Sequence, residues 1–180
     1  MNIKKELSSS KTLLVIMPSI DYNKIMADVI KQLSGKSICY VTLNKTYNSL
    51  RELFEKNNID ISSIVFVDAI SKTIKDTPNQ TKGCYFCSSP GALTEISATL
   101  SKFLNHKFEY IIFDSLTNLL IYHQKYPVAQ FLSALANKIR ESNTKAVFYA
   151  LDVKEHDELI KETEMFVDKV IELKEGGGKK

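Results

Sequence analysis

Glycine is scarce in this chain of 180 residues, which contains six glycines, three of them consecutive at positions 176–178. None lies in the segment 11–25, where an apolar run at 13–17 is followed by a short turn and an amphipathic pattern typical of a helix. A strand, loop and helix in this order can hold a phosphate when glycines let backbone N–H groups wrap around it. This segment therefore lacks the usual phosphate cradle.

Long hydrophobic runs are absent as well. No stretch approaches the ~18 consecutive apolar residues that a membrane-spanning helix needs. The first ten residues, MNIKKELSSS, contain no apolar core of a secretory signal. We therefore expect a cytoplasmic protein with no membrane partner.

Cysteine is rare too: the chain has three, too few for the disulfide framework of a small secreted domain. Cys84 and Cys87 have the spacing of a redox or zinc half-site, but they lie in a run that predicts a strand. Strand residues three apart point to opposite faces. No second pair and no neighbouring histidine supplies further zinc ligands. We expect structural thiols, with a metal or redox role as the alternative.

Excess charge of one sign is confined to the two ends. The chain has 24 basic and 21 acidic residues. Five of the basic and two of the acidic residues lie in segments 1–10 and 174–180, so the body between them is neutral. Proteins that bind nucleic acid usually concentrate basic residues, because neutralising phosphates supplies most of their affinity. Direct nucleic-acid binding is therefore not expected.

Apolar runs alternate with helical patterns, which is typical of α/β proteins whose mostly parallel sheet is flanked by helices. Strands are expected near residues 12–17, 37–43, 63–69, 84–88, 110–113, 146–151 and 169–173. Helices are expected near 22–34, 47–57, 90–104, 128–141 and 155–165. Ser89 and Pro90 form a start signal for the third of these helices, with a hydroxyl cap before a proline at the first position.

The domain organisation is expected to be simple. No repeat or composition break divides the chain, so residues 1–173 are expected to form one domain. Residues 174–180 are expected to be a flexible Gly/Lys tail. The most loop-like interior stretch is 71–80, either a responsive loop or a long connection.

A second informative segment is the apolar run that ends in Asp114-Ser115. A strand with a terminal aspartate resembles a Walker B element, whose carboxylate coordinates the magnesium of a bound nucleotide. Asp114 as a simple helix cap is the alternative interpretation.

Four segments in order resemble the RecA superfamily and, within it, the KaiC-like family. The segment 13–25 is similar to a Walker A unit with Lys24 in the lysine's place, 37–45 to the second strand, 110–116 to the Asp-Ser Walker B, and 166–173 to the terminal strand. The resemblance implies a three-layer RecA-like core with a mostly parallel sheet. It also implies a vestigial nucleotide site at the carboxyl ends of the strands, made of Ser19, Asn23, Lys24, Asn44, Asp114 and Ser115, with Mg²⁺ on Asp114 if a nucleotide binds. Lys24 as a solvated helix residue is the alternative interpretation.

The chain departs from the family where the chemistry takes place. The family's two glutamates after the second strand correspond to Asn44 and Lys45, and neither an amide nor an ammonium group can act as a general base. The magnesium-binding hydroxyl is replaced by Ile25. Asp21 is expected at the N-cap of the predicted helix 22–34. There its carboxylate would accept hydrogen bonds from the N–H groups that a phosphate needs, and its charge would repel the phosphate.

Three functions are consistent with this pattern. The first is a catalytically inactive KaiC-like domain that regulates or assembles through contacts with itself or with a catalytically competent relative. The second is an unconventional ATP- or ADP-binding sensor or slow ATPase, with Mg²⁺. The third is an accessory protein in DNA recombination or repair. We expect no catalytic residue and no obligatory cofactor.

Overall fold

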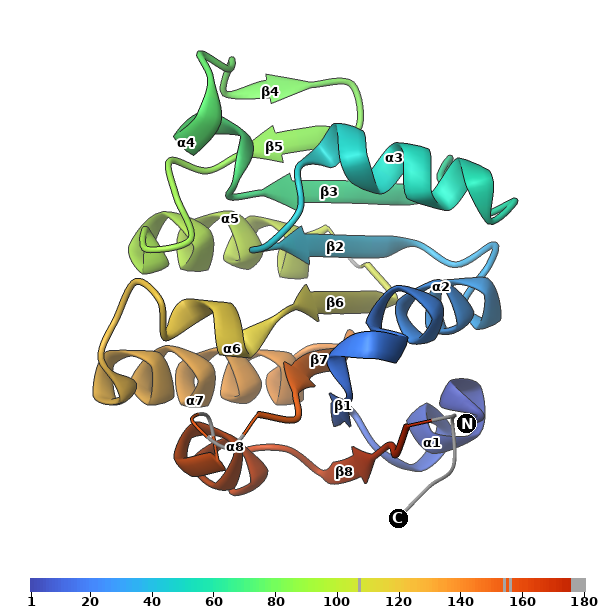
Figure 1. Cartoon of the computed structure of the whole chain (residues 1–180), viewed down its shortest axis with the longest axis vertical. Helices are drawn as coiled ribbons and strands as arrows, with labels where there is room; N and C mark the ends of the chain where they lie inside the picture. The colour runs from blue at the N-terminus through green and yellow to red at the C-terminus, as the bar shows by residue number, and fades with distance from the viewer. Residues whose placement is uncertain (107, 154, 156, 176–180) are drawn as a thin grey trace.

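The computed structural model describes residues 1–106, 108–153, 155 and 157–175, so the predicted tail at 176–180 lies outside the described residues. Its centre is an eight-stranded sheet in the order β4-β5-β3-β2-β6-β7-β1-β8 (Figure 1). Every pairing is parallel except that of β4 with β5. The strands are β1 Thr12–Met17, β2 Ile38–Thr42, β3 Ile64–Asp68, β4 Gln80–Thr81, β5 Cys84–Phe86, β6 Tyr110–Asp114, β7 Lys145–Leu151 and β8 Lys169–Glu172.

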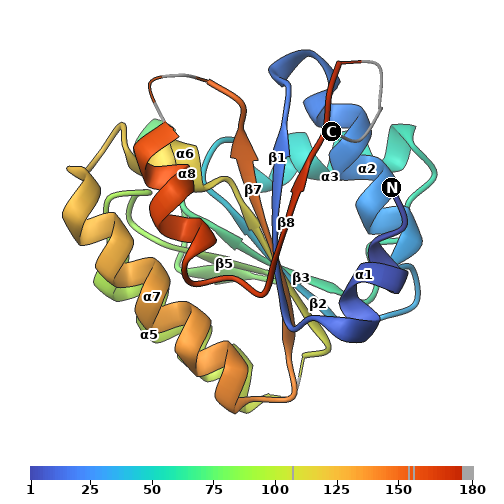
Figure 2. The same cartoon turned by 90° about the horizontal axis from the view of Figure 1, so that it is seen from below.

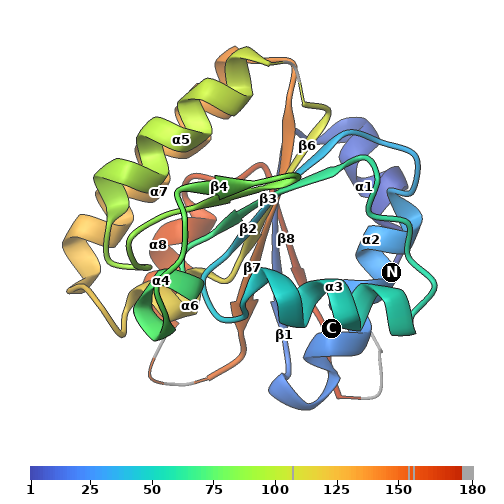
Figure 3. The ribbon, with the colours of Figure 1, turned by 90° about the horizontal axis from the view of Figure 1, so that it is seen from above.

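Helices cover both faces of this sheet, which makes three layers (Figures 2 and 3). One face carries α1, α2 and α3, and the other carries α5, α6, α7 and α8. The helical elements are α1 Ile3–Ser9, the 3-10 turn η1 Ser19–Asp21, α2 Tyr22–Gln32, α3 Tyr47–Lys56, α4 Ser71–Ile74, α5 Leu93–Asn105, α6 Leu116–Leu119, α7 Lys125–Glu141 and α8 Asp157–Glu164. The predicted α/β architecture is confirmed.

The central strands are buried on both faces, which explains their continuous apolar sequences. All six residues of β1 and all five of β2 are buried. Alternating side chains enter two separate cores. Leu13 and Val15 pack under α1 and α2, whereas Leu14 and Ile16 pack under α7. A parallel sheet with two covered faces thus follows from runs in which every position is apolar.

Two helix starts differ from the sequence predictions. Helix α5 begins at Leu93 rather than Pro90, because residues 89–91 form a turn closed by the Ala92 N–H to the Ser89 carbonyl. Helix α7 begins at Lys125, before Pro127, which sits in the first turn, where a missing N–H costs no helical hydrogen bond.

Five short elements lie outside the predicted set: α1, η1, α4, β4 and α6. The loop-like stretch 71–80 contains α4 and the start of the two-residue edge strand β4. Near the N-terminus, Asn2 caps α1 by accepting a hydrogen bond from the Lys5 N–H at 3.0 Å, and Ile3 and Leu7 are buried beside α2. No helix in the described ranges is long and apolar enough to cross a membrane.

Candidate functional site

The carboxyl ends of β1, β2 and β6 lie at the same end of the sheet, where α/β proteins commonly bind their ligands (Figure 1). After β1 the chain passes through Pro18 and η1 directly into α2. Strand β6 ends at Asp114, which is in register with Thr42 at the end of β2. The Walker A-like and Walker B-like segments therefore lie at the same end of the sheet, as predicted.

Asp114 is completely buried at this end of the sheet. The Tyr40 hydroxyl donates a hydrogen bond to its Oδ2 at 2.5 Å, and the Asn44 amide donates to its Oδ1 at 3.2 Å. Burial raises the pKa of the Asp114 carboxyl well above its ordinary value. The alternative interpretation of Asp114 as a helix cap is wrong, because these two side chains take its oxygens and no side chain caps α6.

Tyr22 closes the site from the first turn of α2. Its side chain is buried, and its hydroxyl accepts a 2.6 Å hydrogen bond from the same Asn44 amide nitrogen that contacts Asp114. The Lys45 ammonium lies 5.2 Å from the centre of the Tyr22 ring. We call Tyr22, Tyr40, Asn44 and Asp114 the buried polar network. Both carboxylate oxygens of Asp114 are therefore hydrogen-bonded to side chains of the chain itself.

Two more buried polar groups adjoin the network. The Ser115 hydroxyl donates to the Asn118 side-chain oxygen at 2.5 Å and lies 3.0 Å from the Thr117 hydroxyl. The Tyr149 hydroxyl on β7 is buried and has no hydrogen-bond partner among the described residues. Burial, and then the Asp114 charge, raise the pKa of Tyr149 well above its ordinary value. Ser115 is therefore engaged within the fold, and Tyr149 adds to the desolvated surroundings of Asp114.

The other predicted nucleotide-binding residues lie outside the network. Ser19, Asn23 and Lys24 are exposed. Asn23 lines a cavity of about 480 Å³ together with Asn44. Lys24 instead lines a different cavity, of about 470 Å³, beside Asp28. The structure thus joins Asn44 with Asp114 and separates Lys24 from both.

The prediction that Asp21 bonds the first N–H groups of α2 is wrong. Asp21 occupies the N-cap of α2, but its side chain makes no capping hydrogen bond. The reason is the 3-10 turn before it, which leaves Asp21 with φ −96° and ψ 0° rather than the extended backbone of a capping residue. Ile25, at the position of the magnesium hydroxyl, is buried in the apolar core.

Sequence reasoning missed the tyrosines of the network and a second buried aspartate. Tyr22 and Tyr40 read as helix and strand residues, and no pattern shows that their hydroxyls converge on Asn44 and Asp114. Asp68 ends β3 much as Asp114 ends β6, and it is completely buried. The sequence could have indicated Asp68, because it is an aspartate at the end of an apolar run.

Cys84 and Cys87 do not converge on one site. Cys84 belongs to the core under α3 and Cys87 to the core on the other face, so the prediction of opposite orientation is confirmed. Burial raises the pKa of Cys87 to about 11, and it also raises the pKa of Cys39 and Cys84. No group of metal-ligating side chains occurs in the part of the chain that the structure describes.

We expect these thiols to react slowly in the folded protein. All three are buried, and only the thiolate form attacks a disulfide reagent. With 5,5′-dithiobis(2-nitrobenzoate) at pH 8, the native chain should release thionitrobenzoate far more slowly than the chain in guanidinium chloride. Rapid reaction of two thiols in the native state would contradict this.

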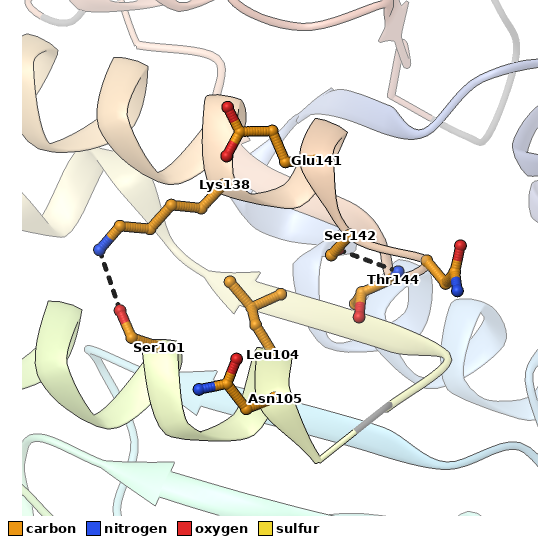
Figure 4. A pocket seen from close by; sticks show the side chains of 8 residues that line it. Ser101, Leu104, Asn105, Lys138, Glu141, Ser142 and Thr144 are labelled. Atoms are coloured by element: carbon orange, nitrogen blue, oxygen red, sulfur yellow. Dashed lines mark hydrogen bonds between the residues drawn. The ribbon is translucent and has the colours of Figure 1, made fainter.

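A further cavity, of about 550 Å³, lies on the sheet face that carries α5 to α8, between the C-terminal ends of α5 and α7 (Figure 4). Lys138 reaches across it and donates a 2.9 Å hydrogen bond to the Ser101 hydroxyl. No predicted site residue lines this cavity. It is therefore separate from the candidate site.

Comparison with solved structures supports the same fold. A KaiC-like protein, PH0186 from Pyrococcus horikoshii OT3, matches with a TM-score of 0.66 and 12% identity, over 92% of this chain and 73% of that one. PH0250 from the same organism matches with a TM-score of 0.60 and 13% identity, over 98% of this chain and 90% of that one. An ATPase from the type III secretion system of pathogenic bacteria matches with 0.58 and 11%, over 92% of this chain and 51% of that ATPase. At these identities the likeness concerns the fold.

Comparison with known sequences gives fewer matches. No curated protein matches the chain. One family model matches residues 2–180, nearly the whole chain. The chain has the fold of KaiC-like domains and belongs to DUF7090, a family of unknown function.

Proposed function

We propose that this chain is a KaiC-like domain that does not hydrolyse nucleotide and that acts as a regulatory or assembly module through protein contacts. The observation that carries the proposal is the buried polar network. It encloses Asp114, the one Walker B-like carboxylate, in hydrogen bonds from Tyr40 and Asn44.

Each component of nucleotide hydrolysis is weakened. A magnesium ligand must be ionised and reachable, whereas Asp114 is fully buried and burial raises its pKa. A general base must be able to accept a proton, and Asn44 instead donates its amide hydrogens to Tyr22 and Asp114. The turn into α2 contains no glycine with which to surround a phosphate.

Exposed apolar side chains support a role in protein contacts. Ile20, Ile74, Ile121 and Tyr126 are between 67% and 80% exposed. They lie on segments that follow the carboxyl ends of β1, β3 and β6. Exposed apolar groups that adjoin one another form surfaces that a partner can cover. The proposed partner is a second copy of this chain or a catalytically competent relative.

The second candidate is a nucleotide sensor, which the cavity beside Asn44 favours. That cavity, of about 480 Å³, is also lined by Lys45 and Lys56, and its volume is within the range of small-molecule sites. A ligand there would contact the half-exposed side of Asn44 and would leave Asp114 buried.

The deciding experiment compares ATP with and without Mg²⁺. We expect that adding Mg²⁺ to millimolar ATP gives no further rise in the melting temperature and no release of phosphate above the rate in buffer. A ligand present at a hundred times its Kd adds about 2.7 kcal/mol to the free energy of unfolding, which thermal unfolding resolves clearly.

The matched variants are Asp114→Asn and Asp28→Asn, the second on the exposed face of α2. Magnesium-dependent turnover that disappears in Asp114→Asn and persists in Asp28→Asn would refute the proposal and establish a slow ATPase. A magnesium-dependent shift without turnover would favour the sensor.

A further inference from the structure

We propose that a cavity between α3, α4 and β4 binds a small phosphorylated molecule. This cavity, of about 370 Å³, is lined by residues of α3, α4, β4 and β5 and of the segments that join them. Strands β4 and β5 form one edge of the sheet (Figure 1). The cavity is away from the buried polar network and shares none of its residues. We call it the basic pocket. Nothing in the resemblance to KaiC-like proteins assigns it a role.

Three cations surround the basic pocket: Arg51 from α3, Lys75 after α4 and Lys82 after β4. Asp76 is the one acidic residue that lines it, so the lining carries a local charge of +2 within a body that is neutral as a whole. Among the described residues, none of the three cations forms an ion pair. Positive charge without an ion-pair partner around a concave surface favours an anionic ligand.

Arg51 is held in an orientation suited to such a ligand. Its guanidinium carbon lies 5.6 Å from the centre of the Tyr47 ring. This cation–π contact engages the charge of the guanidinium without using its N–H groups as hydrogen-bond donors. Tyr47 is itself fixed, with its ring centre 5.1 Å from that of Phe66 and its N–H donating to Asp68 at 2.7 Å. The fork of N–H donors on arginine matches two phosphate oxygens.

The wall opposite α3 is tied to the sheet. The Phe86 N–H donates to the Asn79 carbonyl at 2.9 Å, and the Lys72 ammonium donates to the Asn79 side-chain oxygen at 2.7 Å. The Thr77 hydroxyl donates to the Lys75 carbonyl at 3.0 Å. The stretch predicted from sequence as a loop thus forms a defined side of the basic pocket.

The size and surroundings favour a small ligand over a nucleic acid. A cavity of this volume accommodates a compact molecule. On the exposed side of α3, Glu52 and Glu55 follow Arg51 and interrupt any continuous basic track. A nucleic-acid chain would need several phosphate contacts in a row.

The test uses inorganic pyrophosphate, with EDTA present to exclude magnesium, and calorimetric titration at low salt. We expect saturable binding, and we expect Arg51→Gln to weaken it about tenfold or more, since each charge-assisted hydrogen bond contributes strongly to affinity. Lys82→Gln should also weaken it. Lys102→Gln removes the same charge from exposed α5 on the other face of the sheet and should have no effect.

Two further arms identify the ligand and the site. Arg51→Lys keeps the charge but not the fork and should bind more weakly than the unsubstituted chain. A twelve-nucleotide single strand should bind no better than pyrophosphate. No pyrophosphate binding, equal loss in Lys102→Gln and Arg51→Gln, or clearly tighter binding of the oligonucleotide would each overturn the proposal. Because magnesium is absent and Asp114 is not involved, failure here leaves the proposed lack of hydrolysis untouched.

Discussion

Replacing Asp68 with alanine is expected to lower the free energy of unfolding by about 3–5 kcal/mol, because four buried or part-buried donors would lose their acceptor at once. The Asp68 carboxylate accepts from the backbone N–H groups of Tyr47, Ile70 and Ser71 at 2.7–2.8 Å and from the Ser71 hydroxyl at 2.5 Å. It therefore joins the end of β3 to the first turns of α3 and α4. Urea unfolding followed by circular dichroism measures the loss.

Asp60→Ala is the matched control for Asp68→Ala. Asp60 also accepts hydrogen bonds from a nearby serine, from the Ser62 N–H at 2.8 Å and its hydroxyl at 2.9 Å, but it is exposed. Water replaces those bonds when the carboxylate is removed, so the effect should be much smaller. Equal losses in the two variants would mean that the burial of Asp68 does not determine its contribution.

Asp114→Asn is expected to stabilise the protein at neutral and alkaline pH and to flatten the dependence of its stability on pH. Burial raises the folded-state pKa of Asp114, so the folded chain holds a proton that the unfolded chain has already released. The stability that this proton provides is fully present below the unfolded pKa of about 3.9 and is lost as pH rises through the folded pKa. Within that window one proton contributes a slope of up to about 1.4 kcal/mol per pH unit.

The measurement is the melting temperature of both chains from pH 4.5 to 9. The difference between them should grow in favour of Asp114→Asn as pH rises, because asparagine keeps an acceptor oxygen for Tyr40 or Asn44 and carries no charge. Asp28→Asn, on the exposed side of α2, should show no such trend. A variant that loses stability most at high pH would show that the Asp114 charge is stabilised in the fold.

Both predictions concern aspartates at the ends of β3 and β6, the two strands that flank β2, and they have opposite signs for a physical reason. Asp68 accepts three backbone N–H groups, so removing it leaves donors without partners. Asp114 has two side-chain donors and lies beside the buried Tyr149 hydroxyl, with no cation among its hydrogen-bond partners. The surroundings of each carboxylate, rather than its place at a strand end, set its contribution.

The sequence alone determined the order of the longer strands and helices, because a parallel sheet covered on both faces needs apolar residues at every strand position and an amphipathic stripe on each helix. It also determined the opposite orientation of Cys84 and Cys87, since strand side chains alternate. It failed at helix starts such as that of α5, where a turn of residues 89–91 overrides a favourable Ser-Pro pair.

Only the tertiary structure decided what surrounds Asp114. Tyr22, Tyr40 and Asn44 come from α2, β2 and the loop after β2, and their convergence depends on the position of α2 over β2 and β6. Likewise, Arg51, Lys75 and Lys82 are spread over 32 positions of a neutral body and meet because β4 folds back beside β5. Local pattern fixes which residues face the core, whereas contacts between side chains distant in sequence depend on how the layers pack.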